Sequence, residues 1–188
     1  MRNWEIDEKV KVSSDVIHQR FFKEGEVLPL VVEPARDGVD LLQWAEDNKN
    51  QYDEWIIKYG GILFRGFECR MDRFVEVVSG GLLEYTERSS PRHSVGGNIY
   101  TSTDYPPEEE IFLHNECSYS HSFPTKIFFN CVVEPTDRGG TPLADCRKIY
   151  AKIDSTIRRK FEKKGIMYVR NYSEKLGLPW TTVFNTED

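Results

Sequence analysis

The sequence GILFRGF at residues 61–67 decides the fold class of the chain. Its apolar run ILF is short, rich in strand-forming residues and bounded by glycine, which is typical of a buried β-strand. Apolar residues at helical spacing occur on both sides of this run. They are Tyr52, Trp55, Ile56 and Tyr59 before it, and Phe74, Val75 and Val78 after it. We therefore expect a buried strand that lies between two helices.

The rest of the chain adds strands and helices without a regular alternation. The segment EVLPLVVEP at 26–34 is a predicted strand that Pro34 ends, and TKIFFNCVVEP at 125–135 is a predicted central strand. Residues 145–153 and 155–164 have helical spacing, and IMYV at 166–169 resembles another strand. Because these elements do not form repeated βαβ units, they favour an α+β chain or a decorated β-sandwich.

The composition limits the class of protein. The 188 residues, 39% of them hydrophobic, are enough for a single domain over 1–188 with a real core. The net charge is −6 and no segment is dominated by one sign, so we expect no nucleic-acid partner. No apolar run is long enough to predict a membrane span. The four cysteines form no CxxC pair, and we expect them to be reduced in a cytoplasmic protein.

The segment LHNECSYSHSF at 113–123 contains the clearest candidate for chemistry. In an extended strand, His114 and Glu116 would project from the same face. An imidazole and a carboxylate on one face are the beginning of the 2-His-1-carboxylate arrangement that binds iron(II). Composition alone predicts about 0.7 such His-x-Asp/Glu pairs, so the spacing by itself proves nothing. A metal hydrolase that uses His114, Glu116 and His121 is a weaker alternative.

Four longer segments together carry a resemblance to a known family. They are GILFRGF at 61–67, NIYTSTDYPPEEEIFLHNECSYS at 98–120, FPTKIFFNCVVEP at 123–135 and GGTPLADCRKIY at 139–150. They resemble the taurine dioxygenase-like (TauD/TfdA) oxygenases, in particular the branch of the syringomycin-pathway hydroxylase and clavaminate synthase. The resemblance implies a double-stranded β-helix, which is a cupin-like jelly roll, with flanking helices. Residues 1–60 would decorate its N-terminal side, and 61–188 would form its first part.

The resemblance also implies cofactors and site residues. His114 and Glu116 match two iron ligands, and Thr141 matches the threonine that contacts the distal carboxylate of 2-oxoglutarate. The pocket-lining or ligand-orienting candidates are Asn98, Tyr100, Ser102, Thr103, Ser118 and Tyr119. The implied enzyme uses iron(II), 2-oxoglutarate and oxygen to hydroxylate an unactivated C–H bond. Its substrate would be a small amino-acid-like molecule of secondary metabolism, free or bound to a carrier protein.

One part of the family pattern has no match in the sequence. The family has a second histidine ligand far downstream, followed by an arginine that anchors 2-oxoglutarate, and here only His121 follows the motif. We therefore expect that the C-terminal part of the jelly roll is absent and that the 188 residues alone have little activity. Exposed strand edges would favour association with another copy. The alternative is a non-catalytic, cupin-like interaction module without a complete metal site.

Overall fold

The computed structural model describes residues 15–84, 92–102, 106, 109–137, 139–173, 179–184 and 186. The chain divides into two compact units. The first comprises Met1–Gly81 with Asn130–Ala151, and the second comprises Leu82–Phe129 with Lys152–Asp188. Each unit is described by itself below.

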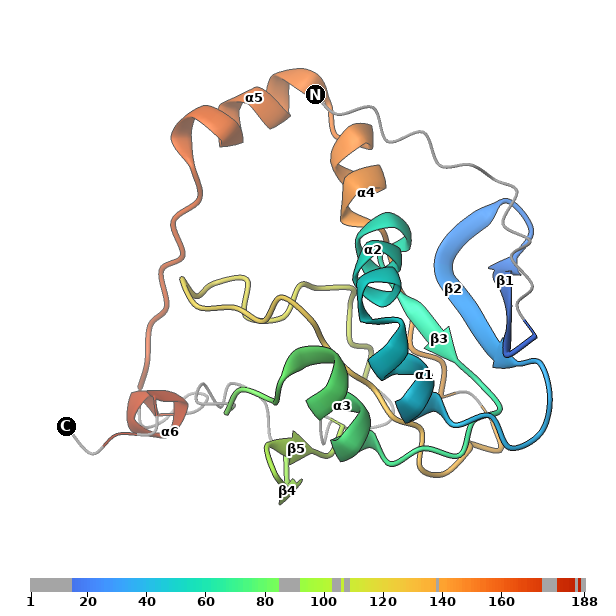
Figure 1. Cartoon of the computed structure of the whole chain (residues 1–188). Coiled ribbons are helices and arrows are strands. Elements are labelled where there is room, and N and C mark those ends of the chain that lie inside the picture. Colours follow the sequence, from blue (N-terminus) through green and yellow to red (C-terminus); the bar gives the residue numbers. More distant parts are fainter. Residues whose placement is uncertain are drawn as a thin grey trace. The chain divides into compact units, whose positions relative to one another are not determined.

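A three-stranded sheet and three helices form most of the first unit (Figure 1). The sheet contains β1 (Ile17–Lys23), β2 (Glu26–Pro34) and β3 (Ile62–Phe64) in that order. β1 pairs with β2 in antiparallel fashion, and β2 pairs with β3 in parallel, with Val31 opposite Leu63. The helices are α1 (Leu41–Asp47), α2 (Lys49–Tyr59) and α3 (Met71–Ser79).

The predictions around GILFRGF are confirmed. The ILF run is strand β3, α2 ends at Gly60 in the left-handed conformation, and α3 ends at Gly80 in the same way. Glycine adopts this conformation without a steric penalty, which is why it commonly follows a helix. The predicted strand over 26–34 is also confirmed, and the Leu30-Val31-Val32 run at its centre is fully buried.

Aromatic side chains form the core between the helices and β3. The Phe64 ring lies at the centre of this cluster, with its centroid 6.0 Å from that of Trp44, 6.5 Å from Tyr52 and 5.2 Å from Phe74. Trp44 in turn stacks on Trp55 at 5.7 Å. Such ring pairs contribute more than the area they bury. The cluster therefore joins α1, α2, α3 and β3 into one unit.

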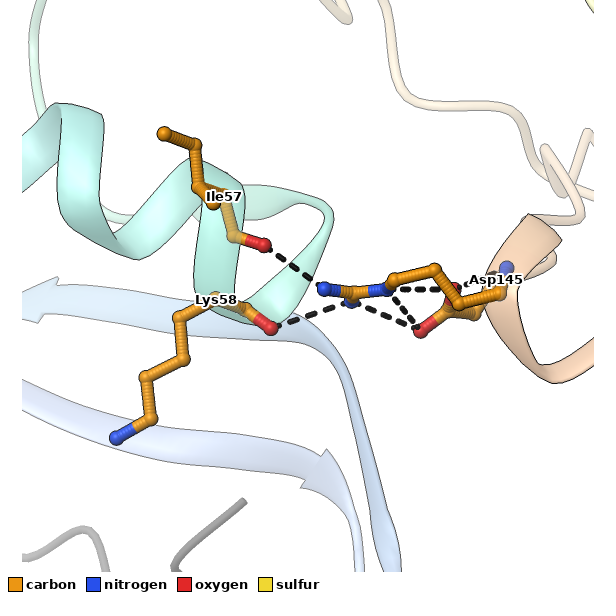
Figure 2. A network of polar contacts seen from close by, with 4 residues as sticks. Ile57, Lys58 and Asp145 are labelled. Carbon is orange, nitrogen blue, oxygen red and sulfur yellow. Dashed lines mark hydrogen bonds and ion pairs between the residues drawn. The ribbon is translucent and has the colours of Figure 1, made fainter. Parts of the chain in front are cut away.

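An arginine clamp connects the start of α4 (Cys146–Lys152) to the end of α2 (Figure 2). The Arg147 guanidinium donates to both carboxylate oxygens of Asp145, with Nη2 2.9 Å from Oδ2. It also donates to the backbone carbonyls of Ile57, at 2.9 Å, and Lys58, at 3.2 Å. The last carbonyls of a helix have no partner within the helix. One side chain thus satisfies two of them and joins residues far apart in sequence.

This clamp makes the stability of the first unit sensitive to acid. Hydrogen bonding from Arg147 holds the pKa of the Asp145 carboxyl below its ordinary value. A carboxyl with a lowered folded-state pKa contributes stability above its unfolded-state pKa, and this contribution is lost as the pH falls through the folded-state pKa. We expect the melting temperature to fall below about pH 4. Asp145→Asn should flatten this acid limb in thermal unfolding followed by circular dichroism; an unchanged limb would contradict this assignment.

The described residues of the second unit include a short hairpin and two helices. The hairpin strands are β4 (Ser94–Gly96) and β5 (Ile99–Tyr100), and the helices are α5 (Ser155–Lys164) and α6 (Trp180–Phe184). The predicted helix over 155–164 is confirmed, with the Asp154 side chain accepting from the backbone N–H groups of Thr156 and Ile157. This is the usual stabilisation of a helix N-terminus. The hairpin and α6 were not predicted.

Two predicted strands are wrong. Residues 125–135 and 166–169 carry strand-forming side chains, yet neither segment is a strand, and large apolar side chains such as Phe129 and Met167 are exposed. A strand requires a neighbouring edge, and neither segment pairs with one in the described ranges. Cys131 and Cys146 are both exposed.

The observed mixture of helices and two small sheets agrees with the predicted α+β class. The larger jelly-roll sheets and the single domain over 1–188 stay predictions. In the part of the chain that the structure describes, no helix has the length and apolar character needed to cross a membrane.

Candidate metal centre

The backbone at the His-x-Glu motif is a turn rather than the expected strand. Residues 111–115 have no regular secondary structure, and 116–119 form a turn in which the N–H of Ser120 donates to the carbonyl of Cys117 at 3.0 Å. Cys117 has a φ of 52°, in the left-handed region that non-glycine residues seldom adopt. Such strain is found more often at functional sites than elsewhere.

The two side chains nevertheless face each other. His114 Nε2 lies 3.9 Å from Glu116 Oε2. The sequence predicted this proximity from the alternating side chains of an extended strand. The segment is not a strand, and the turn that begins at Glu116 brings the two side chains close instead. Their proximity is therefore a property of the turn.

The imidazole of His114 has one nitrogen engaged and the other directed at Glu116. Nδ1 lies 2.8 Å from the backbone carbonyl oxygen of Phe112. A carbonyl oxygen only accepts, so Nδ1 carries the proton and donates it in this contact. In the neutral ring Nε2 then has a free lone pair, and a bond from the other ring nitrogen to a carbonyl is typical of histidines that bind metals. This side chain is 58% exposed and can be reached from solvent.

Glu116 is more enclosed and has a cationic neighbour that sequence reasoning missed. Its side chain is 20% exposed, and its Oε1 lies 3.6 Å from Nη2 of Arg92. Arg92 precedes β4 and is itself 26% exposed. No periodicity or motif links Arg92 to Glu116, and the ion pair becomes visible only in the fold.

His114 and Glu116 provide two of the ligands that a first-row metal ion would need. Two adjacent ligands of an octahedral ion lie about 3 Å apart when the bonds are about 2.1 Å long. The 3.9 Å between His114 Nε2 and Glu116 Oε2 is slightly longer, and a small rotation of the Glu116 side chain would close the difference. Imidazole nitrogen and carboxylate oxygen both suit iron(II). Among the described residues, no group of three histidine, cysteine, aspartate or glutamate side chains is placed to hold a metal.

The other predicted site residues of the second unit have varied positions. Asn98 lies in the β4–β5 turn with a φ of 61°, and its Nδ2 donates to the carbonyl of Leu82 at 3.0 Å, which gives it a structural role there. Tyr100 is half-buried in β5, and Ser102 is exposed after it. Thr103 lies outside the described residues. Their pocket-lining roles stay predictions.

The residues that follow Glu116 differ in exposure. Ser118 is exposed, whereas Tyr119 is half-buried with its ring 4.6 Å from the Arg170 guanidinium. His121 is exposed. Thr141 is exposed too and belongs to the first unit, whereas His114 and Glu116 belong to the second. The role of Thr141 in binding 2-oxoglutarate therefore stays a prediction.

Comparison with known proteins establishes the family. The family model described as taurine catabolism dioxygenase TauD, TfdA family, matches residues 26–187, which is most of the chain. The chain therefore belongs to the TauD/TfdA family, whose enzymes are iron(II)- and 2-oxoglutarate-dependent oxygenases with a jelly-roll fold.

Two relatives are similar over much of the chain. The dapdiamide synthesis protein DdaC of Enterobacter agglomerans is 35% identical over 139 residues, which cover 72% of this chain and 42% of the relative. A clavaminate synthase-like protein of Arabidopsis thaliana is 28% identical over 202 residues, which cover 96% of this chain and 61% of the relative. The chain thus spans about half the length of these relatives.

Proposed function

We propose that this chain carries the iron-binding motif of an iron(II)- and 2-oxoglutarate-dependent oxygenase, with His114 and Glu116 as two iron ligands. The observation that supports this most is the pair itself. Nε2 and Oε2 face each other at 3.9 Å, while the contact from Nδ1 to the Phe112 carbonyl leaves Nε2 free to bind a metal. Membership of the TauD/TfdA family supports iron(II) as the metal and 2-oxoglutarate as the co-substrate.

Each residue has a defined task in this proposal. His114 contributes a neutral nitrogen and Glu116 a charged oxygen, so the pair offsets one of the two charges of the metal. Thr141 would donate its hydroxyl to the distal carboxylate of 2-oxoglutarate. Bound iron(II) and 2-oxoglutarate would activate molecular oxygen, which is the oxidant for attack on a C–H bond. The protein positions the substrate and excludes water.

The proposed substrate is a small amino-acid-like molecule, free or attached to a carrier protein. The name of one relative assigns it to dapdiamide synthesis, which supports a role in the synthesis of small molecules. Hydroxylation is the proposed outcome, because Glu116 provides a carboxylate where a halogenase of this family would leave room for halide. A cytoplasmic location and association with a second copy belong to the same proposal.

Titration with cobalt(II), a spectroscopic substitute for iron(II), tests the ligand assignment. We expect His114→Ala and Glu116→Ala each to weaken cobalt(II) binding at least about tenfold, because each removes a donor atom. The matched control is His121→Ala, which removes a neighbouring histidine and should leave binding unchanged. Equal binding by His114→Ala and the unaltered chain would contradict the proposal. Weakened binding in His121→Ala would favour the hydrolase that uses all three residues.

A second titration separates the oxygenase from a non-catalytic module. Iron(II) and then 2-oxoglutarate are added without oxygen, and the visible charge-transfer band of their chelate is measured. We expect this band to appear with an oxygenase site and to weaken in Thr141→Val. Metal binding without any band would favour either the interaction module, which keeps the fold without binding the co-substrate, or an oxygenase site that these 188 residues leave incomplete.

A further inference from the structure

Arg92 lies beside one carboxylate oxygen of Glu116, and His114 faces the other. Arg92 Nη2 is 3.6 Å from Oε1, while the other carboxylate oxygen, Oε2, is 3.9 Å from His114 Nε2. The two oxygens of one carboxylate thus have different neighbours. A contact of 3.6 Å is longer than a hydrogen bond, so Arg92 acts on Glu116 through its charge.

The need for such a cation follows from the surroundings of Glu116. Its side chain is 20% exposed, and a carboxylate with so little access to water is stabilised by a nearby positive charge. His114 Nε2 lies 3.9 Å from Oε2, which is too far for a hydrogen bond that would hold Glu116 in place. Arg92 supplies an attraction at the other carboxylate oxygen, Oε1.

We infer that Arg92 is a positioning residue for the metal site, which holds Oε1 of Glu116 and so presents Oε2 alone to the metal. This inference rests on the proposed function, because it assumes that His114 and Glu116 bind the metal. It adds that Glu116 binds through one oxygen and that the ligand pair is arranged before the metal arrives. A preorganised site loses less freedom on binding and therefore binds more tightly.

The positive charge of Arg92 also repels a metal cation, and this effect opposes the first. The guanidinium, however, lies nearest to Oε1, whereas His114 faces Oε2, so the two cations would be nearest to different oxygens of one carboxylate, whose negative charge offsets part of their repulsion. Removing Arg92 would leave a poorly solvated carboxylate free to rotate away from His114. Loss of a partner that orients a ligand typically costs 10–100-fold in metal affinity.

The experiment compares cobalt(II) binding to the unaltered chain with binding to Arg92→Met, Arg92→Lys and Arg20→Met. We expect Arg92→Met to raise the Kd about 10–100-fold. Arg92→Lys should restore most of the affinity, because it keeps the charge. The cobalt(II) absorption spectrum should change in Arg92→Met, since release of Oε1 allows the carboxylate to bind through both oxygens.

Arg20→Met is the matched control because it removes an arginine from another arginine–glutamate pair, that of Arg20 with Glu33 at 2.9 Å. It should leave both the Kd and the spectrum unchanged, and circular dichroism checks that every variant is folded. An unaltered affinity and spectrum in folded Arg92→Met, or tighter binding, would overturn the role of Arg92 while the proposed function stands. If the unaltered chain binds no better than His114→Ala, the proposed site fails and this inference with it.

Discussion

Exchange of Phe64 for alanine is expected to lower the free energy of unfolding by about 3 kcal/mol. The Phe64 ring contacts the rings of Trp44, Tyr52, Phe67 and Phe74, which belong to three helices and a loop. Removing it leaves a cavity where these elements meet, and the rigid aromatic neighbours can fill it only in part. Because Phe64 itself is half-buried, the lower part of the usual range for phenylalanine applies.

Urea unfolding followed by tryptophan fluorescence measures this effect, since Trp44 and Trp55 stack beside Phe64. The control is Phe129→Ala, which removes the same side chain at a position that is 73% exposed. That exchange should change the stability by less than about 0.5 kcal/mol. Similar losses in the two variants would show that the aromatic cluster does not stabilise the first unit as the ring geometry indicates.

Local patterns in the sequence predicted much of the first unit. The helices α2 and α3 have apolar residues at helical spacing, and a glycine directly follows each of them. The strand β2 ends at Pro34 for a similar reason, since proline lacks the N–H that a ladder requires. These features depend only on residues that are close in sequence, so a local sequence pattern is enough to predict them.

The predicted strands over 125–135 and 166–169 failed because pairing is not a local property. Their side chains have strand propensity, but a strand forms only where an edge is available to accept its hydrogen bonds. Within the described residues, these segments expose apolar side chains and pair with no strand. Residue propensity therefore predicted a strand in two segments that form none.

The candidate site shows the same division. The spacing of His114 and Glu116 identified them as a candidate pair, and the resemblance to oxygenases supplied the reason to expect that they bind a metal. The turn with its strained Cys117 and the ion pair with Arg92 could not be predicted. Both depend on how segments distant in sequence or unusual in backbone conformation come together, and neither leaves a periodic pattern.

Exchange of Arg147 for methionine is expected to destabilise the first unit by about 2 kcal/mol. The exchange leaves the Asp145 carboxylate, whose side chain is only 7% exposed, without its cation, and it leaves the carbonyls of Ile57 and Lys58 without their donors. A buried charge that loses its partner typically costs more than this. The Arg147 side chain is itself 37% exposed, however, so water screens the pair and reduces the loss.

Two further variants show whether the stabilisation by Arg147 depends on the forked shape of its guanidinium or on its charge. Arg147→Lys keeps the charge but cannot reach Asp145 and both carbonyls together, so it should recover less than half of the loss in urea unfolding. Arg147→Met combined with Asp145→Asn should be more stable than the sum of the single losses predicts, because the carboxylate is then no longer left alone. Additive losses would contradict a clamp in which Arg147 serves Asp145 and the end of α2 at once. The geometry predicts that the two losses are coupled, because one planar guanidinium binds both the Asp145 carboxylate and the carbonyls at the end of α2 (Figure 2). Its contact with Asp145 holds the guanidinium in position for the carbonyls, and its contact with the carbonyls holds it in position for Asp145.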